Sequence, residues 1–237
     1  MTLDASGNVG ILNNVASTIA TANSRNGLVV GSGSGNNGVT VYSGNTSNSS
    51  LFFADSTTGA PTYIGQVNYD HNADAMSFAT TATERMRIDA SGRVTTPYQP
   101  AVCAYPDVNG NNSIAAGATQ LLPFGRTYFN NGNHYSTSNR VFTAPVAGYY
   151  FTSAQVRWET ESFVMSSYVR LFISLNNGDY NSTRIHVING NNEAFTNYMA
   201  MSCSGIVYCS AGDTLRPKGG QNGGTSNLHG ESSFNVY

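Results

Sequence analysis

No window of a dozen residues in this chain keeps the 3.6-residue spacing of apolar side chains that an amphipathic helix needs. The polarity of the chain comes from Asn, Ser, Thr and Gly, which favour turns and oppose long helices. Between these polar stretches lie short apolar pieces rich in Val, Ile, Tyr and Phe, a pattern typical of strands. We therefore expect an all-β protein.

Charge and hydropathy argue against two classes of partner. Only 10% of the residues are Asp, Glu, Lys or Arg, the net charge is −2, and the ten arginines and the single Lys218 form no run. Nucleic acid is therefore not expected to bind, because nothing supplies a basic surface. No apolar stretch approaches the roughly 20 residues that cross a bilayer, so we expect no membrane insertion. Residues 1–20 lack the basic start and unbroken apolar run of a signal peptide.

A short motif occurs twice, 85 residues apart. Leu3-Asp4-Ala5-Ser6-Gly7-Asn8-Val9 returns as Ile88-Asp89-Ala90-Ser91-Gly92-Arg93-Val94, with five of seven positions identical. In each copy an apolar strand end meets an Asp-Ala-Ser-Gly turn, and a Val resumes the strand. Glycine allows the positive φ that such a turn can require, and Asp and Ser can accept bonds from nearby backbone amides.

Residues 1–96 are predicted to form a β-rich stem. Their candidate strands are 27–30, 39–42, 51–53, 63–69, 76–78 and 85–88, each with only two to four large apolar side chains. Such a thin segment cannot bury a core alone, so we expect it to pack against copies of itself in an elongated homotrimer. The side chains expected in that trimer core are Ile64, Val67, Met76, Phe78, Met86 and Ile88.

The segment Pro97-Tyr98-Gln99-Pro100 is the clearest linker, because two close prolines favour an extended chain. Residues 101–237 are predicted to form a compact knob of eight to ten short strands, the count of a jelly-roll β-sandwich. Its clearest strand alternates Val169, Leu171, Ile173 and Leu175 on one face. Phe172, on the other face, predicts a second covered surface, as at a trimer contact.

Six residues of the knob form a spaced aromatic and glycine pattern: Phe124, Asn130, Tyr135, Phe142, Gly148 and Tyr150. Their intervals resemble the signature of the globular head of complement component 1q. The sequence departs from the signature at Thr152, where a Phe is expected. The resemblance implies a ten-stranded jelly roll of the tumour-necrosis-factor type, which assembles as a trimer and binds partners through outer loops.

The stem resembles a different family. Ser77-Phe78 followed by residues 84–94 is similar to a segment that recurs in bacteriophage tail-fibre proteins. That resemblance implies a homotrimeric virion fibre, made in the host cytoplasm and acting outside the cell. Its other partners would be virion tail or baseplate proteins, and its knob would bind a host-surface receptor, a glycan or a protein.

The cysteines agree with a protein that folds in a reducing compartment. There are three, an odd number, and Cys203 and Cys209 would lie roughly 20 Å apart on one straight strand, too far for a disulfide. We expect Cys103, Cys203 and Cys209 to be buried free thiols.

No cofactor or metal site is expected. The spaced glycines at 33–38 precede an apolar piece at 39–42 and not a helix, so no helix N-terminus is available for a pyrophosphate. Residues 70–74 begin like a calcium loop, but Ala75 replaces the required Gly, and a hairpin turn is expected instead. The four histidines have no partner at metal-ligand spacing.

The predicted receptor contacts lie in the knob. Trp158 with Glu159 or Glu161 would suit a carbohydrate, because an aromatic face and carboxylate acceptors complement a sugar. The outer loops offer uncharged amide and phenol groups that suit polar recognition. Their candidate residues are Tyr180, Asn191, Asn192, Asn222 and Asn227.

Two alternatives remain open. In one, the chain is a purely structural trimerising fibre or assembly protein of the virion. In the other, Glu159 and Glu161 are the acid and base of a tail spike that degrades polysaccharide, because carboxylates two apart on a strand lie roughly 7 Å apart at the backbone. Tail spikes of that kind resemble much longer β-helices, so we expect no enzyme here.

Overall fold

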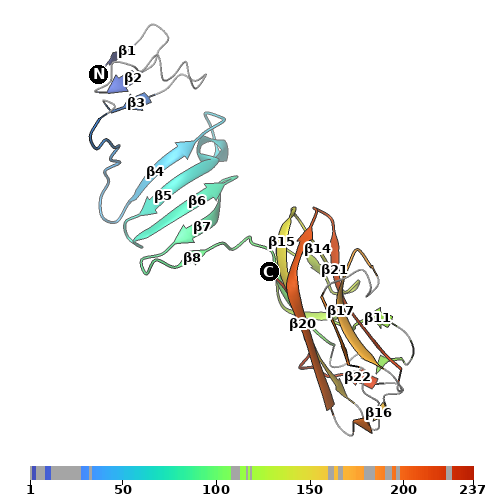
Figure 1. Cartoon of the computed structure of the whole chain (residues 1–237). Helices are drawn as coiled ribbons and strands as arrows, with labels where there is room; N and C mark the ends of the chain where they lie inside the picture. The colour runs from blue at the N-terminus through green and yellow to red at the C-terminus, as the bar shows by residue number, and fades with distance from the viewer. Residues whose placement is uncertain are drawn as a thin grey trace. The chain divides into compact units, whose positions relative to one another are not determined.

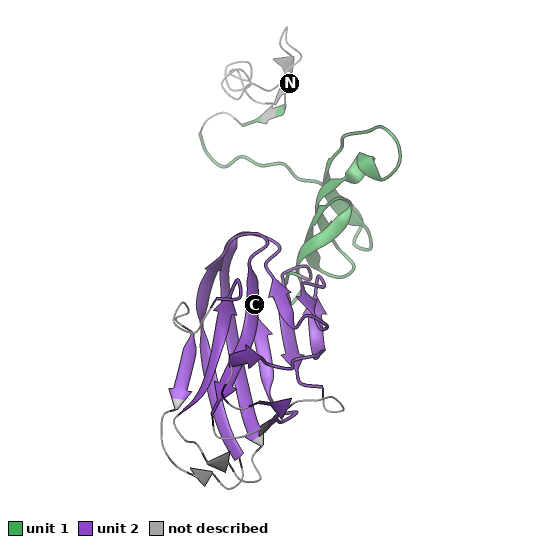
Figure 2. Cartoon of the chain, turned by 90° about the vertical axis from the view of Figure 1, so that its right-hand side faces the viewer, with its two compact units in different colours: residues 1–96 green, residues 97–237 purple. Residues whose placement is uncertain are grey.

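The computed structural model describes residues 2–3, 9–11, 28–31, 34–107, 113–115, 117, 119–159, 163–164, 168–178, 185–189, 194–195, 198–222 and 226–237. Within them the chain is almost entirely β, with one short 3-10 helix, η1 (Ala60–Tyr63). No described helix is long and apolar enough to cross a membrane. The chain divides into two compact units, residues 1–96 and 97–237 (Figure 2). The prediction of an all-β fold is confirmed.

Unit 1 contains two small sheets (Figure 1). The first joins β1 (Thr2–Leu3), β2 (Val9–Ile11) and β3 (Leu28–Val30). The second is an antiparallel meander of β4 (Asn48–Phe53), β5 (Gly65–Asp70), β6 (Ala75–Thr80), β7 (Thr83–Ile88) and β8 (Val94–Thr95). The strand expected at 39–42 does not form, and Val39, Val41 and Tyr42 are exposed.

The repeated motif forms equivalent strand pairs. Leu3 pairs with Val9 in the first copy, and Ile88 pairs with Val94 in the second, both antiparallel. In the second copy, Asp89 Oδ1 accepts hydrogen bonds from the backbone N–H of Ser91 at 2.9 Å and of Arg93 at 3.0 Å. Gly92 has φ +76°, which explains the glycine at that turn position.

Unit 2 is a sandwich of two sheets. Sheet one has the strand order β10-β22-β15-β23-β9-β12, with β20 on the other edge of β15. Its strands are β9 (Ala101–Tyr105), β10 (Ser113–Ile114), β12 (Arg126–Asn131), β15 (Gly148–Glu159), β20 (Tyr198–Cys209), β22 (Ser226–Leu228) and β23 (Ser233–Val236).

Sheet two has the order β13-β14-β21-β17-β18, with β11 paired to β21. Its strands are β11 (Thr119–Leu121), β13 (Tyr135–Ser136), β14 (Val141–Thr143), β17 (Val169–Leu175), β18 (His186–Asn189) and β21 (Thr214–Gln221). A separate pair joins β16 (Phe163–Val164) to β19 (Ala194–Phe195). Asn176 and Asn177 follow β17 with positive φ, as in a tight turn.

The core lies between the two sheets, as the jelly-roll prediction requires. Alternate residues of β15 point inward, so Tyr150, Ala154, Val156 and Trp158 are buried, and they meet Leu171 and Ile173 of β17 in one cluster. Cys203 and Cys209 lie on β20 and are buried free thiols, whereas Cys103 is half-buried. Burial raises the pKa of Cys203 to about 12 and that of Cys209 to about 11.

Candidate functional site

One end of sheet one carries an uncharged aromatic surface on the side turned away from the core. Tyr149 is 79% exposed and Ile206 is 70% exposed, although both belong to long, fully paired strands. We call this surface the aromatic face, and it consists of Phe129, Tyr149, Phe151, Ile206, Tyr208 and Tyr237. Large exposed apolar patches on ordered strands mark interaction surfaces.

The side chains of the aromatic face contact one another. The rings of Tyr149 and Tyr208 lie 5.3 Å apart in an edge-to-face arrangement, because these residues pair across β15 and β20. The ring of Tyr237 lies 6.4 Å from both Phe129 and Phe151. The face is therefore continuous from β20 across β15 to β12, and a flat partner could contact all of it.

The other end of sheet one is polar and charged on the same outer side. We call this group the polar cluster, and it consists of Arg157, Tyr198, Asn227, His229 and Glu231. The Arg157 guanidinium carbon lies 3.9 Å from the centre of the Tyr198 ring. Arg157 Nη1 donates to Glu231 Oε2, which forms an ion pair. Between the two ends, Ser153, Gln155, Ser202 and Ser204 form a polar strip along β15 and β20.

The larger sheet of unit 1 also has one apolar face. Leu51, Val67, Phe78 and Met86 are paired in a row across β4 to β7. The next row on this face contains Tyr69, Met76, Ile88 and Val94. All of these side chains are half-buried or exposed. Five of the six stem residues predicted for a trimer core thus share one open face, which we call the stem face.

The sixth stem residue, Ile64, lies at the end of η1, and its carbonyl accepts a hydrogen bond from Ala82 N–H at 2.9 Å. The opposite side of the sheet is mostly polar, and on it only the small side chains of Ala75 and Ser77 are buried among the described residues. There the Arg87 guanidinium bonds Glu84 and holds the pKa of that carboxyl below its usual value. The apolar and polar sides of the stem sheet are therefore clearly distinct.

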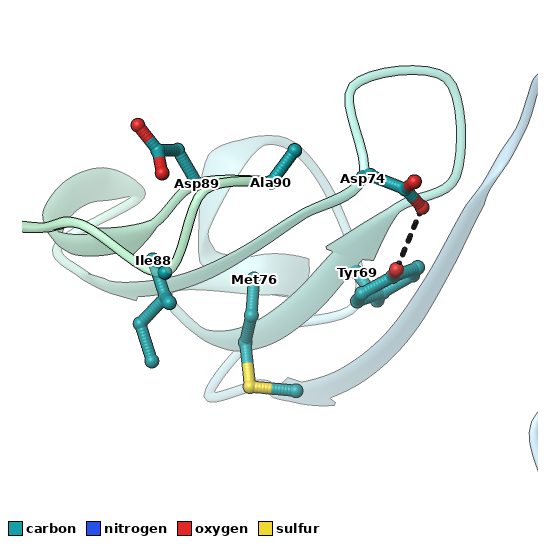
Figure 3. Close-up of a pocket in the computed structure, with 7 residues that line it drawn as sticks. Tyr69, Asp74, Met76, Ile88, Asp89 and Ala90 are labelled. Atoms are coloured by element: carbon teal, nitrogen blue, oxygen red, sulfur yellow. Dashed lines mark hydrogen bonds between the residues drawn. The ribbon is translucent and has the colours of Figure 1, made fainter.

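A shallow pocket of about 430 Å³ opens at one end of the stem face. Met76 and Ile88 point to the same side of the sheet in Figure 3, and the Tyr69 hydroxyl donates to Asp74 Oδ1 at 2.9 Å. Asp70 caps the adjoining turn by accepting from the N–H groups of Asn72 and Ala73. Residues 70–74 thus form the expected hairpin turn.

Two predicted site residues are corrected by their burial. Trp158 is 1% exposed in the core, because it is an even-numbered, inward residue of β15, so it cannot offer its ring to a sugar. Phe172 is 0% exposed within the single chain. The chain itself covers the second face of β17, and a contact with another subunit is not open to this side chain.

The other predicted receptor contacts fall into three groups. Asn227 is exposed, and its backbone pairs with that of Glu159, which pairs on its other side with Tyr198. Asn222 is half-buried, and its Oδ1 accepts from Tyr168 N–H at 3.1 Å. Glu161, Tyr180, Asn191 and Asn192 lie outside the described residues.

The aromatic face and most of the polar cluster were not predicted from the sequence. The signal for the first was present, because Tyr149 and Phe151 alternate with the inward residues Tyr150 and Thr152. No local pattern brings Arg157, Tyr198 and Glu231 together, because they come from three segments distant in sequence. Among the described residues, no three His, Cys, Asp or Glu side chains gather as a metal site.

Residues 108–204 match the family model of the C1q domain. The signature residues of that resemblance are structural here: Tyr135 OH donates to the Phe124 carbonyl at 2.8 Å, and the rings of Phe142 and Tyr150 lie 5.6 Å apart. No curated protein matches the chain significantly in sequence. Among solved structures, the globular domain of zebrafish complement 1qA protein is similar, with 12% identity and a TM-score of 0.43 over 59% of this chain and 96% of that one.

Proposed function

We propose that this protein is a homotrimeric fibre component of a bacteriophage tail whose C1q-type head binds a receptor on the host surface. The observation that carries the proposal is the pair of open apolar surfaces, the aromatic face and the stem face. Each belongs to a different compact unit, and each exposes apolar side chains from neighbouring paired strands.

The occupant of both surfaces is a second and third copy of the same chain. The aromatic face has no charged side chain, so it suits a partner surface that is equally uncharged, and three copies that bring this face to a common three-fold axis supply one. The stem sheet is a single layer with one apolar and one polar side, and such a layer becomes stable when its apolar side is buried against another layer.

Receptor binding is supported by the match of residues 108–204 to the C1q domain and by the polar cluster at the opposite end of sheet one from the aromatic face. A trimer would present three identical polar clusters. Weak single contacts then combine into strong attachment through avidity. The tail-fibre assignment is supported by the segment at 84–94, which resembles phage fibre proteins.

The first experiment is the mass of the native protein in solution by light scattering, compared with the chain mass of 25.1 kDa. We expect three times the chain mass. Ile206→Asp places a carboxylate in the aromatic face, which the trimer would bury, and should dissociate the head contact, because an unpaired buried charge is costly. Thr143→Asp, at an exposed position on sheet two, is the matched control and should leave the mass unchanged.

A monomeric wild-type protein would overturn the proposal. A trimer that attaches to no cell would contradict receptor binding and would favour the purely structural fibre role. The labelled trimer should therefore also be tested for attachment to a panel of bacterial cells, and a variant whose mass falls to that of one chain is expected to attach far more weakly, because it loses avidity.

A further inference from the structure

We propose that the polar cluster is a binding site for a neutral carbohydrate, with Tyr198 as the platform for the sugar ring. This inference rests on the proposed receptor-binding function and assigns its site and ligand class. It replaces Trp158, which is buried, with the aromatic side chain that is available at the same end of sheet one.

The cluster is held in place by backbone contacts and not only by its side chains. Arg157 lies on β15, where its N–H donates to Ser232 Oγ at 2.9 Å and its carbonyl accepts from His229 N–H at 2.9 Å. Ser232 N–H donates to the His229 carbonyl at 3.0 Å, and Glu231 N–H donates to His229 Nδ1 at 3.2 Å. The turn that carries Glu231 is therefore fixed against the strand that carries Arg157, which lowers the entropy cost of binding.

Tyr198 provides an aromatic surface of the right kind. The Arg157 guanidinium covers part of the Tyr198 ring, with its carbon 3.9 Å from the ring centre, yet Tyr198 is still 56% exposed. His229 lies edge-on to the ring, with centroids 6.3 Å apart. A tyrosine fixed between two neighbours but open to solvent offers its ring with little loss of conformational freedom, as rigid aromatics do in paratopes.

The charge balance favours a neutral ligand. The positive charge of Arg157 is matched by Glu231, whose side chain is 68% exposed, so no net field attracts a polyanion. Glu231 Oε2 contacts Arg157, and Oε1 accepts no hydrogen bond from the described residues. A carboxylate oxygen next to the arginine that contacts the aromatic ring, with the exposed Asn227 across β15 from Tyr198, matches the adjacent hydroxyls and apolar C–H face of a hexose.

The test uses the full-length protein on an array of immobilised oligosaccharides. The neutral probes are oligomers of glucose, galactose, mannose, rhamnose, N-acetylglucosamine and N-acetylgalactosamine, and the anionic probes carry sulfate or uronic acid groups. We expect binding to at least one neutral probe, weakened about tenfold or more by Tyr198→Ala and by Glu231→Gln. The matched control is Arg126→Gln, which breaks an exposed ion pair with Asp107 elsewhere in unit 2 and should leave binding unchanged.

The mass and melting temperature of each variant separate the possible failures. A trimeric wild-type protein that binds no neutral probe, or only anionic probes, overturns this inference and leaves the proposed trimer intact. Binding that survives in trimeric, folded Tyr198→Ala and Glu231→Gln also overturns it. A monomeric wild-type protein overturns the proposed function itself.

Discussion

Asn130 and Tyr135 hold each other through two hydrogen bonds: Asn130 Nδ2 donates to the Tyr135 carbonyl at 2.8 Å, and Tyr135 N–H donates to Asn130 Oδ1 at 3.0 Å. The asparagine side chain thereby acts as an extra backbone unit that closes the connection from β12 to β13. This closure aims the Tyr135 ring into the core, where its hydroxyl reaches Phe124.

Asn130→Ala should therefore lower the free energy of unfolding by about 1–3 kcal/mol, because it leaves a part-buried donor and acceptor without partners. The measurement is chemical denaturation of the purified protein. Asn131→Ala, an exposed position on the same strand, is the control and should change stability by less than about 0.5 kcal/mol. Equal effects of the two variants would contradict the role of Asn130.

Phe172 and Phe151 should separate folding from assembly. Phe172→Ala removes a side chain that is buried within one chain, so it should cost about 3–5 kcal/mol of stability and leave the trimer mass unchanged below the melting transition. Phe151→Ala removes an exposed ring of the aromatic face and should weaken assembly with little effect on the fold of the head. Light scattering and denaturation of both variants check this, and the reverse pattern would show that the two faces were assigned wrongly.

The thiols should react in an order set by burial. Burial raises the pKa of Cys203 to about 12 and of Cys209 to about 11, so at pH 8 the reactive thiolate is a minute fraction of either. Cys103 is only half-buried. A thiol reagent at pH 8 should modify at most Cys103 in the native protein and all three cysteines after denaturation. Rapid labelling of Cys203 in the native protein would contradict the burial of its side chain on the inner face of β20.

Protonation of Asp213 in acid should make the head less stable. Asn176 Nδ2 donates to Asp213 Oδ1 at 2.7 Å and Ser210 N–H donates to Oδ2 at 2.7 Å, and these bonds lower the pKa of the carboxyl. A lowered native pKa contributes stability above the unfolded pKa of about 4, and this contribution is lost as the pH falls through the native value.

Asp213→Asn should accordingly lower the melting temperature at pH 7 and make little difference near pH 2. The comparison is the melting temperature of the two proteins across this range. A difference in melting temperature between the two proteins that stays constant with pH would show that the carboxylate charge is not what stabilises this turn.

Regular alternation was the part of the fold that could be predicted from sequence. The strand expected from Val169 to Leu175 is β17, and the same period of two runs through β15. By the same alternation, Trp158 belongs to the inward set, yet its chemistry suggested a surface role. The strand β12 carries a register shift between Thr127 and Phe129, which breaks the period of two and hides it.

Residues 39–42 have strand-forming side chains but no paired neighbour, and they stay outside any sheet.

The candidate site was harder to predict because its residues come together only in the folded chain. The polar cluster joins β15, β20 and the segment before β23, so only the register of those strands brings Arg157, Tyr198 and Glu231 together. The stem face was easier, because its residues sit on adjacent hairpins.

β15 pairs with β20 at every position, from Gly148 with Cys209 to Glu159 with Tyr198, and no bulge interrupts the ladder. The aromatic face lies at one end of this ladder and the polar cluster at the other. A tensile load applied to a bound ligand would therefore run along the strands towards the proposed subunit contact. It would load the interstrand hydrogen bonds at the same time, in shear, and would not break them one after another from one end of the ladder.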